Sequence, residues 1–448
     1  MNYNDTYYSK NMKAIILGAG ISGVSLAHYL QKNKKIKEII IVEKNREPGG
    51  LMRSFNCKGI LYDVGPHIIF SKYKNILKKN ISLLKKNIST IKRSNKIIFK
   101  SRLIKYPFEN ELYKLPKEDL EYCLNSFLNN PFENYNYNNM IQFFLKNFGE
   151  GITRTYLEPY NRKIWKFDPS FMDTQMVDRI PKPPREDILK SSKGINTEGY
   201  KHQLYFQYPV KNGIQSLFDV YINTLNKKNK IFLNQKIKKI NRDKNKFLIH
   251  TQKNCFKGDL LFSTIPLNEF CEIYENVPDN ILTTSKKLLY NSIIISLVNV
   301  KGHKGGDNFA FMIPDKNIIF HRISKLDFLG KNYSKKNSTS FLVEITFREG
   351  DQISKLKNDE IFKKIISGLI KLKFCSSNKD VNFYEIRKFK YAYVIYDLFH
   401  RINVDKILKF FKKKNIHNAG RCGSWEYLNS DQVIHQSRKI ITNVLRKI

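Results

Sequence analysis

A glycine-rich turn near the start of the chain constrains its fold more than any other feature. The turn Gly18-Ala19-Gly20-Ile21-Ser22-Gly23 follows the apolar run Ala14–Leu17 and precedes a helix-like segment. A second apolar run ends at Glu43, twenty positions after Gly23. In a βαβ unit such glycines let the backbone approach a pyrophosphate, and the acid accepts hydrogen bonds from ribose hydroxyls. This order predicts a dinucleotide site; a structural βαβ turn without a ligand is the alternative.

A glycine pair, Gly49-Gly50, follows Glu43. Together with the turn and the acid, this pair describes a site built to hold FAD. We expect FAD to bind noncovalently, at one per chain.

The composition is that of a globular protein with more than one structural unit. With 448 residues, 41% of them hydrophobic, the chain is too long for one compact core, so we expect two or three units. No apolar run reaches the ~18 residues of a membrane span, and the first ten residues are too polar for a signal peptide. We therefore expect a cytoplasmic protein without a transmembrane segment. The six cysteines include no CxxC pair, so we expect no metal.

The formal net charge of +39 raises the question of nucleic-acid binding, because Lys and Arg neutralise phosphates. The excess is mostly lysine, spread along the chain, and no zinc-finger, RNP or helix-turn-helix signature accompanies it. We interpret it as a solvated surface and expect no specific nucleic-acid partner. Part of the field could still steer an anionic substrate or meet an anionic membrane surface.

The order of segments predicts an α/β fold with a discontinuous Rossmann-like FAD-binding domain, an inserted helical domain and an antiparallel β-sheet substrate domain. Helix-like patterns fill residues 110–180, whereas 292–300 and 340–346 have strand-like composition. We expect the final helix to begin near Asp431, with its N-terminus facing the cofactor. The predicted limits are 12–75, 204–265 and 395–448 for the FAD domain, 110–203 for the helical domain, and 76–109 with 266–394 for the substrate domain.

Several segments, in the same order, resemble the flavin-dependent UDP-galactopyranose mutases, particularly their eukaryotic-type branch. They are Pro48-Gly49-Gly50-Leu51, Leu61–Tyr73, Tyr106-Pro107-Phe108-Glu109-Asn110, Leu115-Pro116-Lys117-Glu118, Pro159–Trp165 and Gly420–Tyr427. The matches extend from residue 14 to the C-terminus and are shared with the wider group of protoporphyrinogen oxidases and amine oxidases. Leu51 favours the mutases, because the oxidases more often carry an arginine after the glycine pair.

The resemblance implies a reaction, a cofactor and a substrate. Members of the family interconvert the pyranose and furanose forms of a nucleotide-linked hexose through a sugar adduct on N5 of reduced flavin, without net redox change. For this chain the resemblance implies FAD, active when reduced, with NAD(P)H as a candidate electron donor. It also implies a UDP-hexose similar to UDP-galactose as substrate and a role in cell-surface polysaccharide synthesis. The oligomeric state stays open.

The same resemblance assigns site residues by position. Because a departing diphosphate carries concentrated negative charge, arginines and tyrosine hydroxyls are its expected partners. The catalytic candidates are Arg179, Arg322 and His67. The substrate-binding candidates are Tyr106, Asn161, Trp165, Arg179, Arg322, Tyr393 and Tyr427. The FAD-binding candidates are Gly18, Gly20, Ile21, Ser22, Gly23, Glu43, Lys44, Gly50, Leu51, Gly65, His67, Gly420, Arg421, Tyr427, Asn429, Asp431 and Gln432.

These residues also have structural explanations. The arginines can be surface charges, Tyr393 and Trp165 can fill a core, and His67 can make a structural hydrogen bond. Pro66 stands where the eukaryotic enzymes usually have glycine. Residues 309–314 lack, at the register that the resemblance implies, the aromatic pair that helps hold the nucleotide. The sugar and base therefore stay open. The alternatives are a FAD-dependent oxidoreductase of the amine oxidase or protoporphyrinogen oxidase type, and a non-catalytic or nucleic-acid-binding protein.

Overall fold

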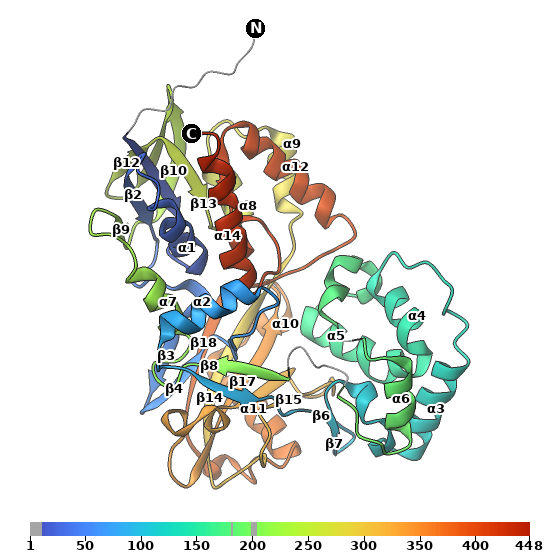
Figure 1. The fold of residues 1–448 in the computed structure, drawn as a ribbon. Helices are drawn as coiled ribbons and strands as arrows, with labels where there is room; N and C mark the ends of the chain where they lie inside the picture. Colours follow the sequence, from blue (N-terminus) through green and yellow to red (C-terminus); the bar gives the residue numbers. More distant parts are fainter. Residues whose placement is uncertain (1–10, 181, 199–203) are drawn as a thin grey trace.

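The structure, a computed structural model, describes residues 11–180, 182–198 and 204–448 (Figure 1). The glycine turn lies in a five-stranded parallel sheet of order β19-β13-β1-β2-β9. The strands are β1 Met12–Leu17, β2 Ile36–Val42, β9 Lys230–Phe232, β13 Leu260–Ser263 and β19 Ile416–Asn418. Segments from the start, middle and end of the chain thus build one sheet.

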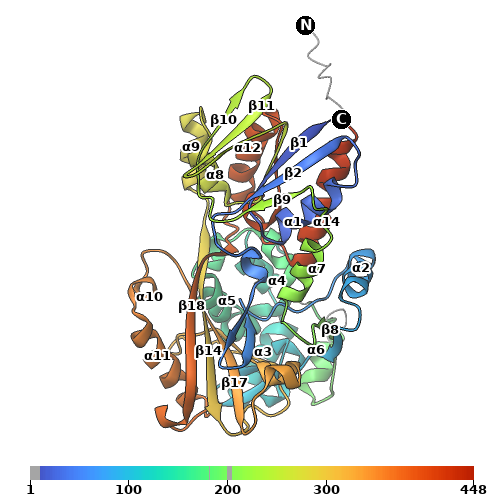
Figure 2. The ribbon, with the colours of Figure 1, turned by 90° about the vertical axis from the view of Figure 1, so that its left-hand side faces the viewer.

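Both faces of this sheet are covered, which explains the unbroken apolar runs in its strands. Ala14 and Ile16 of β1 pack in one core, and Ile15 and Leu17 pack in the core on the opposite face. The first face carries α1 Ile21–Leu30 and α14 Ser430–Leu445, with α2 Lys74–Leu84 and α7 Gln215–Ile222 beside them (Figure 2). The opposite side holds β10 Ile237–Asp243, β11 Lys246–Thr251, β12 Cys255–Gly258, α8 Leu267–Ile273, α9 Asp279–Lys286 and α12 His400–Lys413.

A second, seven-stranded sheet has the order β18-β14-β17-β16-β15-β6-β7 and is antiparallel except between β15 and β6. Its strands are β6 Asn95–Phe99, β7 Arg102–Lys105, β14 Tyr290–Lys301, β15 Ala310–Met312, β16 Arg322–Lys325, β17 Ser338–Phe347 and β18 Val381–Val394. Ile294 packs with Ile361 and Ile365 of α11 Asn358–Lys371, which follows α10 Gln352–Lys355. Ile293 and Ile295 face the main core instead.

A helical region projects to one side of the two sheets (Figure 1). It contains α3 Lys117–Leu128, α4 Met140–Ile152, the π-helical turn η4 Thr153–Leu157, α5 Glu158–Trp165 and α6 Arg185–Ser192. Pro116 directly precedes α3, where proline is tolerated because the first N–H groups of a helix have no intrahelical partner. Residue 181, directly after the helix-like segment expected over 110–180, lies outside the described residues.

Short elements complete the fold. The hairpin strands are β3 Ser54–Cys57 and β4 Ile60–Asp63, and β5 Ser89–Lys92 pairs with β8 Tyr205–Tyr208. The remaining helical turns are η1 Gly50–Met52, η2 Phe108–Asn110, η3 Leu112–Lys114, η5 Pro169–Phe171, η6 Thr174–Arg179, η8 Leu326–Leu329, η9 Lys331–Tyr333, η10 Asn378–Asp380 and α13 Gly420–Gly423.

The predicted fold class is confirmed, because a parallel Rossmann-like sheet, an antiparallel sheet and a helical region are all present. The domain limits stay a prediction. Within the predicted 204–265 segment, β8 pairs with β5 and not with the parallel sheet. Across the described ranges, no helix has both the length and the apolar character that crossing a membrane requires.

Candidate functional site

The glycine turn leaves open space in front of α1. The backbone of Gly20, the residue before α1, is extended, with φ −79° and ψ −179°. A Cβ added at Gly20 would meet no atom within 4 Å, whereas one at Gly23 would lie 2.0 Å from the carbonyl oxygen of Gly18. Gly23 is therefore required by helix–strand packing, but Gly20 faces free volume. The first N–H groups of a helix lack intrahelical partners, so the space suits a pyrophosphate.

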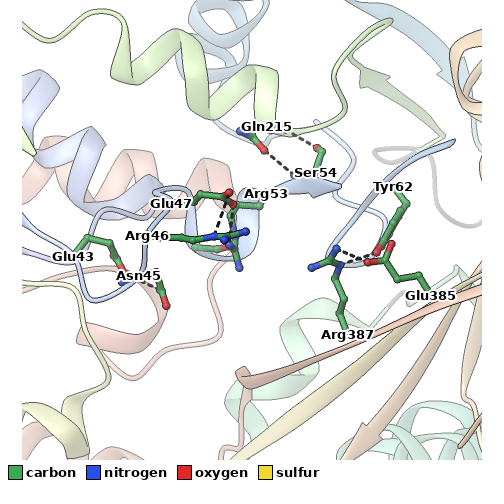
Figure 3. Close-up of polar contacts among 11 residues, drawn as sticks. Glu43, Asn45, Arg46, Glu47, Arg53, Ser54, Tyr62, Gln215, Glu385 and Arg387 are labelled. Atoms are coloured by element: carbon green, nitrogen blue, oxygen red, sulfur yellow. Dashed lines mark hydrogen bonds and ion pairs between the residues drawn. The ribbon is translucent and has the colours of Figure 1, made fainter. Parts of the chain in front are cut away.

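Glu43 lies beside this turn with a buried carboxylate. Its Oε2 accepts a hydrogen bond from the N–H of Ala19 at 2.9 Å. Its Oε1 accepts bonds from the backbone N–H and the side-chain amide of Asn45, at 2.9 and 2.7 Å (Figure 3). Two carboxylate oxygens offer about four lone-pair sites, so one remains for a ribose hydroxyl. Lys44, in contrast, is half exposed and pairs with Glu269 at 3.4 Å.

The glycine pair connects the turn to an anchored hairpin. The N–H of Gly49 donates to the carbonyl oxygen of Ala19 at 2.9 Å, and Gly50 begins η1. Ser54 N–H donates to Gln215 Oε1 at 3.1 Å, and Arg387 Nε donates to the hydroxyl of Tyr62 at 2.8 Å (Figure 3). These bonds tie the β3–β4 hairpin to α7 and to β18, and thereby fix the loop that follows β4.

A cavity of about 600 Å³ begins where that loop ends. Residues from the loop after β4, from the seven-stranded sheet and from the start of α14 line it together. Eleven predicted site residues are among them: Leu51, Gly65, His67, Tyr106, Arg322, Tyr393, Arg421, Tyr427, Asn429, Asp431 and Gln432. The lining also contains Lys72, Arg93, Lys182 and Glu344, which sequence reasoning missed. Five basic side chains against two carboxylates, Glu344 and Asp431, make the cavity attractive to anions.

Arg322 and Glu344 form a bidentate pair in the wall of the cavity. They face each other on β16 and β17, and Nε and Nη2 of Arg322 donate to the two carboxylate oxygens at 2.5 and 2.6 Å. Glu344 is 0% exposed. Burial alone would lower the pKa of Arg322, but the adjacent carboxylate raises it above its usual value. The sequence contains an indication that Glu344 is a site residue, because it is a lone carboxylate within the apolar run Phe341–Ile345.

His67 is held in its neutral form beside the same wall. Its Nδ1 lies 3.1 Å from the carbonyl oxygen of Gly65, which places the proton on Nδ1 and leaves Nε2 as an acceptor. Burial, with the nearby charges of Arg421 and Arg322, lowers the pKa of His67 to about 4. At neutral pH this imidazole is therefore uncharged and can accept a hydrogen bond through Nε2.

The buried imidazole of His67 predicts an acid-labile contribution to stability. Its folded pKa of about 4 lies below the ordinary value of 6.5, so this contribution is complete above pH 6.5 and is lost as the pH falls toward 4. We expect the free energy of unfolding to decrease between neutral pH and about pH 5 more in the wild type than in His67→Asn, by up to about 1.4 kcal/mol per pKa unit. Urea unfolding at both pH values measures this difference, and equal decreases would contradict it.

An aromatic cluster supports the tyrosines of the cavity. The ring of Trp165 lies edge-on to Tyr393 and to Tyr427, with centroids 5.7 Å apart in both cases. Trp165 Nε1 donates to Asn161 Oδ1 at 2.8 Å, and the amide of Asn161 donates to the carbonyl oxygen of Leu157. Neither Asn161 nor Trp165 is among the cavity-lining residues, so the structure places them behind the tyrosines.

The last segment meets the glycine turn. A Cβ at Gly420 would lie 2.4 Å from Oγ of Ser22, so Gly420 packs directly on the start of α1. Helix α14 begins at Ser430, next to the predicted Asp431. Asp431 accepts a hydrogen bond from Ser71 Oγ at 2.6 Å.

Three predicted cofactor ligands have structural duties in this segment. Asn429 and Gln432 form the two halves of a capping box at the start of α14. Arg421 donates to the carbonyl oxygens of Leu428 and Ala392. The FAD contacts predicted for them remain predictions.

Arg179 is the last residue of η6. Its side chain lies outside the part of the chain that the structure describes. Its neighbour Ile180 lines the cavity. A convergence of Arg179 with Arg322 therefore stays a prediction.

Comparison with known proteins agrees with this architecture. Residues 16–79 match the family model of an NAD(P)-binding Rossmann-like domain. A reduced UDP-galactopyranose mutase superposes with a TM-score of 0.88 at 22% identity, over 98% of this chain and 96% of that one. A protein from Exiguobacterium sp. 255-15 with the provisional name protoporphyrinogen oxidase superposes with a TM-score of 0.76 at 14% identity, over 98% of this chain and 99% of that one. Cyclohexylamine oxidase from Brevibacterium oxydans IH-35A superposes with a TM-score of 0.66 at 12% identity, over 97% of this chain and 99% of that one. The chain is thus similar in fold to a UDP-galactopyranose mutase and to oxidases.

Proposed function

We propose that the protein is a FAD-dependent nucleotide-sugar mutase that interconverts the pyranose and furanose forms of a UDP-hexose similar to UDP-galactose. The observation that carries the proposal is the basic cavity in which Arg322, Arg421 and His67 meet. Five cations against two carboxylates suit a substrate with a diphosphate. A protonated amine would meet like charge in the same cavity.

The residues around the turn fit FAD. The open space at Gly20 and the N-terminus of α1 would receive the pyrophosphate, and Glu43 would receive the ribose. When bound and reduced, FAD supplies the nucleophile for the anomeric carbon of the sugar. The likeness to a reduced UDP-galactopyranose mutase over nearly the whole chain supports this choice.

The chain's own residues then have distinct tasks. A guanidinium has five N–H donors, and Glu344 uses two of those on Arg322, which leaves three in a fixed orientation for the departing diphosphate. Neutral His67 can accept a hydrogen bond through Nε2, which would orient the sugar hydroxyl that reacts during ring opening or closure. Arg179 is proposed as a second donor to the diphosphate, and Tyr393 and Tyr427 as further donors.

The decisive experiment compares the two redox states of the flavin. We expect the dithionite-reduced protein, but not the oxidised protein, to convert UDP-galactopyranose into its furanose form without consuming oxygen. Anaerobic incubation followed by chromatography of the nucleotide sugars measures the conversion, and an oxygen electrode checks the second point. The matched control is the same protein kept oxidised.

A reduced, FAD-loaded protein that leaves every nucleotide hexose unchanged would contradict the proposal. Oxygen uptake with an amine or a porphyrinogen would then favour the oxidoreductase alternative. Bleaching of the flavin by NADPH or NADH under anaerobic conditions tests the proposed electron donor separately.

A further inference from the structure

We propose that the protein has a second ligand site, for a small phosphorylated molecule, in a cleft between α5 and the α10–α11 segment. The cleft has a volume of about 920 Å³ and shares no lining residue with the cavity described above. Its walls come from α5, from residues 314–319 between β15 and β16, and from α10 and α11.

The lining of the cleft is strongly basic. It contains five basic side chains and one carboxylate, Glu158; the basic residues are Arg162, Lys163, Lys166, Lys316 and Lys364. Glu158 is already engaged, because Arg162 Nε donates to its Oε1 at 2.9 Å and Arg154 pairs with its other oxygen. Arg162 also pairs with Asp168 at 2.7 Å. The acid in the lining is therefore not available to the lysines.

Within the described ranges, the lysines of the cleft form no salt bridge, although the charges of Asp315 and Asp351 lie near Lys163 and Lys166. Lys163 Nζ donates only to carbonyl oxygens, those of Ile313 and Asp315, at 2.8 and 2.7 Å. Among the described residues, the amino groups of Lys166, Lys316 and Lys364 have no hydrogen bond or salt bridge. Burial lowers the pKa of Lys163 to about 7 and also lowers the pKa of Lys166. Burial outweighs the nearby carboxylates for both amines, and a bound anion would offset the cost of burying their charge.

The rest of the lining indicates what the anion carries. The walls also contain six apolar residues, Pro159, Pro314, Ile318, Ile319, Ile353 and Leu356, and the polar residues Asn317, Gln352 and Ser367. Apolar walls beside a group of amines fit a ligand with both a phosphate and a flat or apolar part, as in a nucleoside phosphate. Inorganic phosphate alone would leave those walls uncovered.

The helix α5 separates this cleft from the cavity. The cleft is lined by positions 158, 159, 162, 163 and 166, which share one helical face. Trp165 points to the other side, against Tyr393. A ligand in the cleft would thus contact the helix that supports the tyrosines, without entering the cavity.

Pyridoxal 5′-phosphate is a suitable probe for this site, and the experiment uses the FAD-loaded protein. Its aldehyde condenses with a neutral lysine amine to form a C=N bond with loss of water, and borohydride reduces that bond to a stable secondary amine. We expect peptide mapping to find the label on Lys163 or Lys166, and we expect inorganic pyrophosphate or ADP to protect these positions. Label on Lys72 or Lys182 would instead report the other cavity.

Two charge-matched variants make the test specific. Lys364→Gln removes a cation of the cleft, whereas Lys363→Gln removes its exposed neighbour on the same helix, which does not line the cleft. We expect Lys364→Gln to weaken protection by ADP about tenfold, the effect of losing one charge-assisted hydrogen bond, and Lys363→Gln to leave it unchanged. FAD content should be the same in both. Equal effects of the two variants, or label spread evenly over surface lysines without protection, would overturn the proposal.

Discussion

Gly20→Val is expected to yield a folded protein that has lost nearly all of its flavin. The backbone of Gly20 has φ −79°, which valine adopts without strain, and the space around an added Cβ is open in the protein. The valine methyl groups would occupy the volume in front of α1 that a pyrophosphate needs. Losing two charge-assisted hydrogen bonds there would weaken FAD binding by about two to four decades. Flavin absorbance per protein after gel filtration, with titration of the stripped protein, measures the loss.

Gly23→Val is the informative counterpart of this change. A Cβ there would lie 2.0 Å from the carbonyl oxygen of Gly18, so α1 must move away from β1. This variant should lose thermal stability as well as flavin, whereas Gly20→Val should keep the melting temperature of the flavin-free wild type. A folded Gly20→Val protein with a full complement of flavin would refute the cofactor assignment.

The Rossmann-like part could be predicted because its signals are local. The apolar run of β1, the glycine turn and Glu43 lie within a short stretch of sequence, and each has one physical explanation in a βαβ unit. The structure adds that the two glycines have different roles. Gly23 is required for close packing of helix and strand, whereas Gly20 leaves open the space in front of α1. Spacing alone does not separate these two reasons.

The cavity was harder to predict because long-range pairing builds it. Glu344 meets Arg322 only through the register of β16 and β17, and Lys72 and Lys182 reach the cavity from loops. Asn429 and Gln432 illustrate a different limit. Their spacing is that of a capping box, a local motif that explains them without any ligand.

Arg322→Lys should lower the turnover of a nucleotide hexose by about two to three decades, the usual cost of removing a preorganised donor from developing charge. Lysine keeps the charge beside Glu344 but cannot reproduce the bidentate geometry or direct further N–H groups into the cavity. We expect the affinity for substrate to change less than the turnover. Arg179→Lys should act in the same direction if its side chain meets the same diphosphate. Isomerisation kinetics of the reduced, FAD-loaded proteins measure both effects.

The control for Arg322→Lys is the same exchange at Arg102. That arginine lies on β7 of the same sheet, donates to the carbonyl oxygens of Lys114 and Leu115, and does not line the cavity. Arg102→Lys should therefore keep nearly full turnover, which separates loss of the donor from general damage to the sheet. In Arg322→Lys the buried carboxylate of Glu344 is paired less well than in the wild type. The double variant Arg322→Lys with Glu344→Gln removes the negative charge of that carboxylate. If the double variant regains stability but not turnover, Arg322 acts in catalysis and not only in folding.

Unchanged turnover and affinity in both Arg322→Lys and Arg179→Lys would count against the mutase and favour the oxidoreductase alternative.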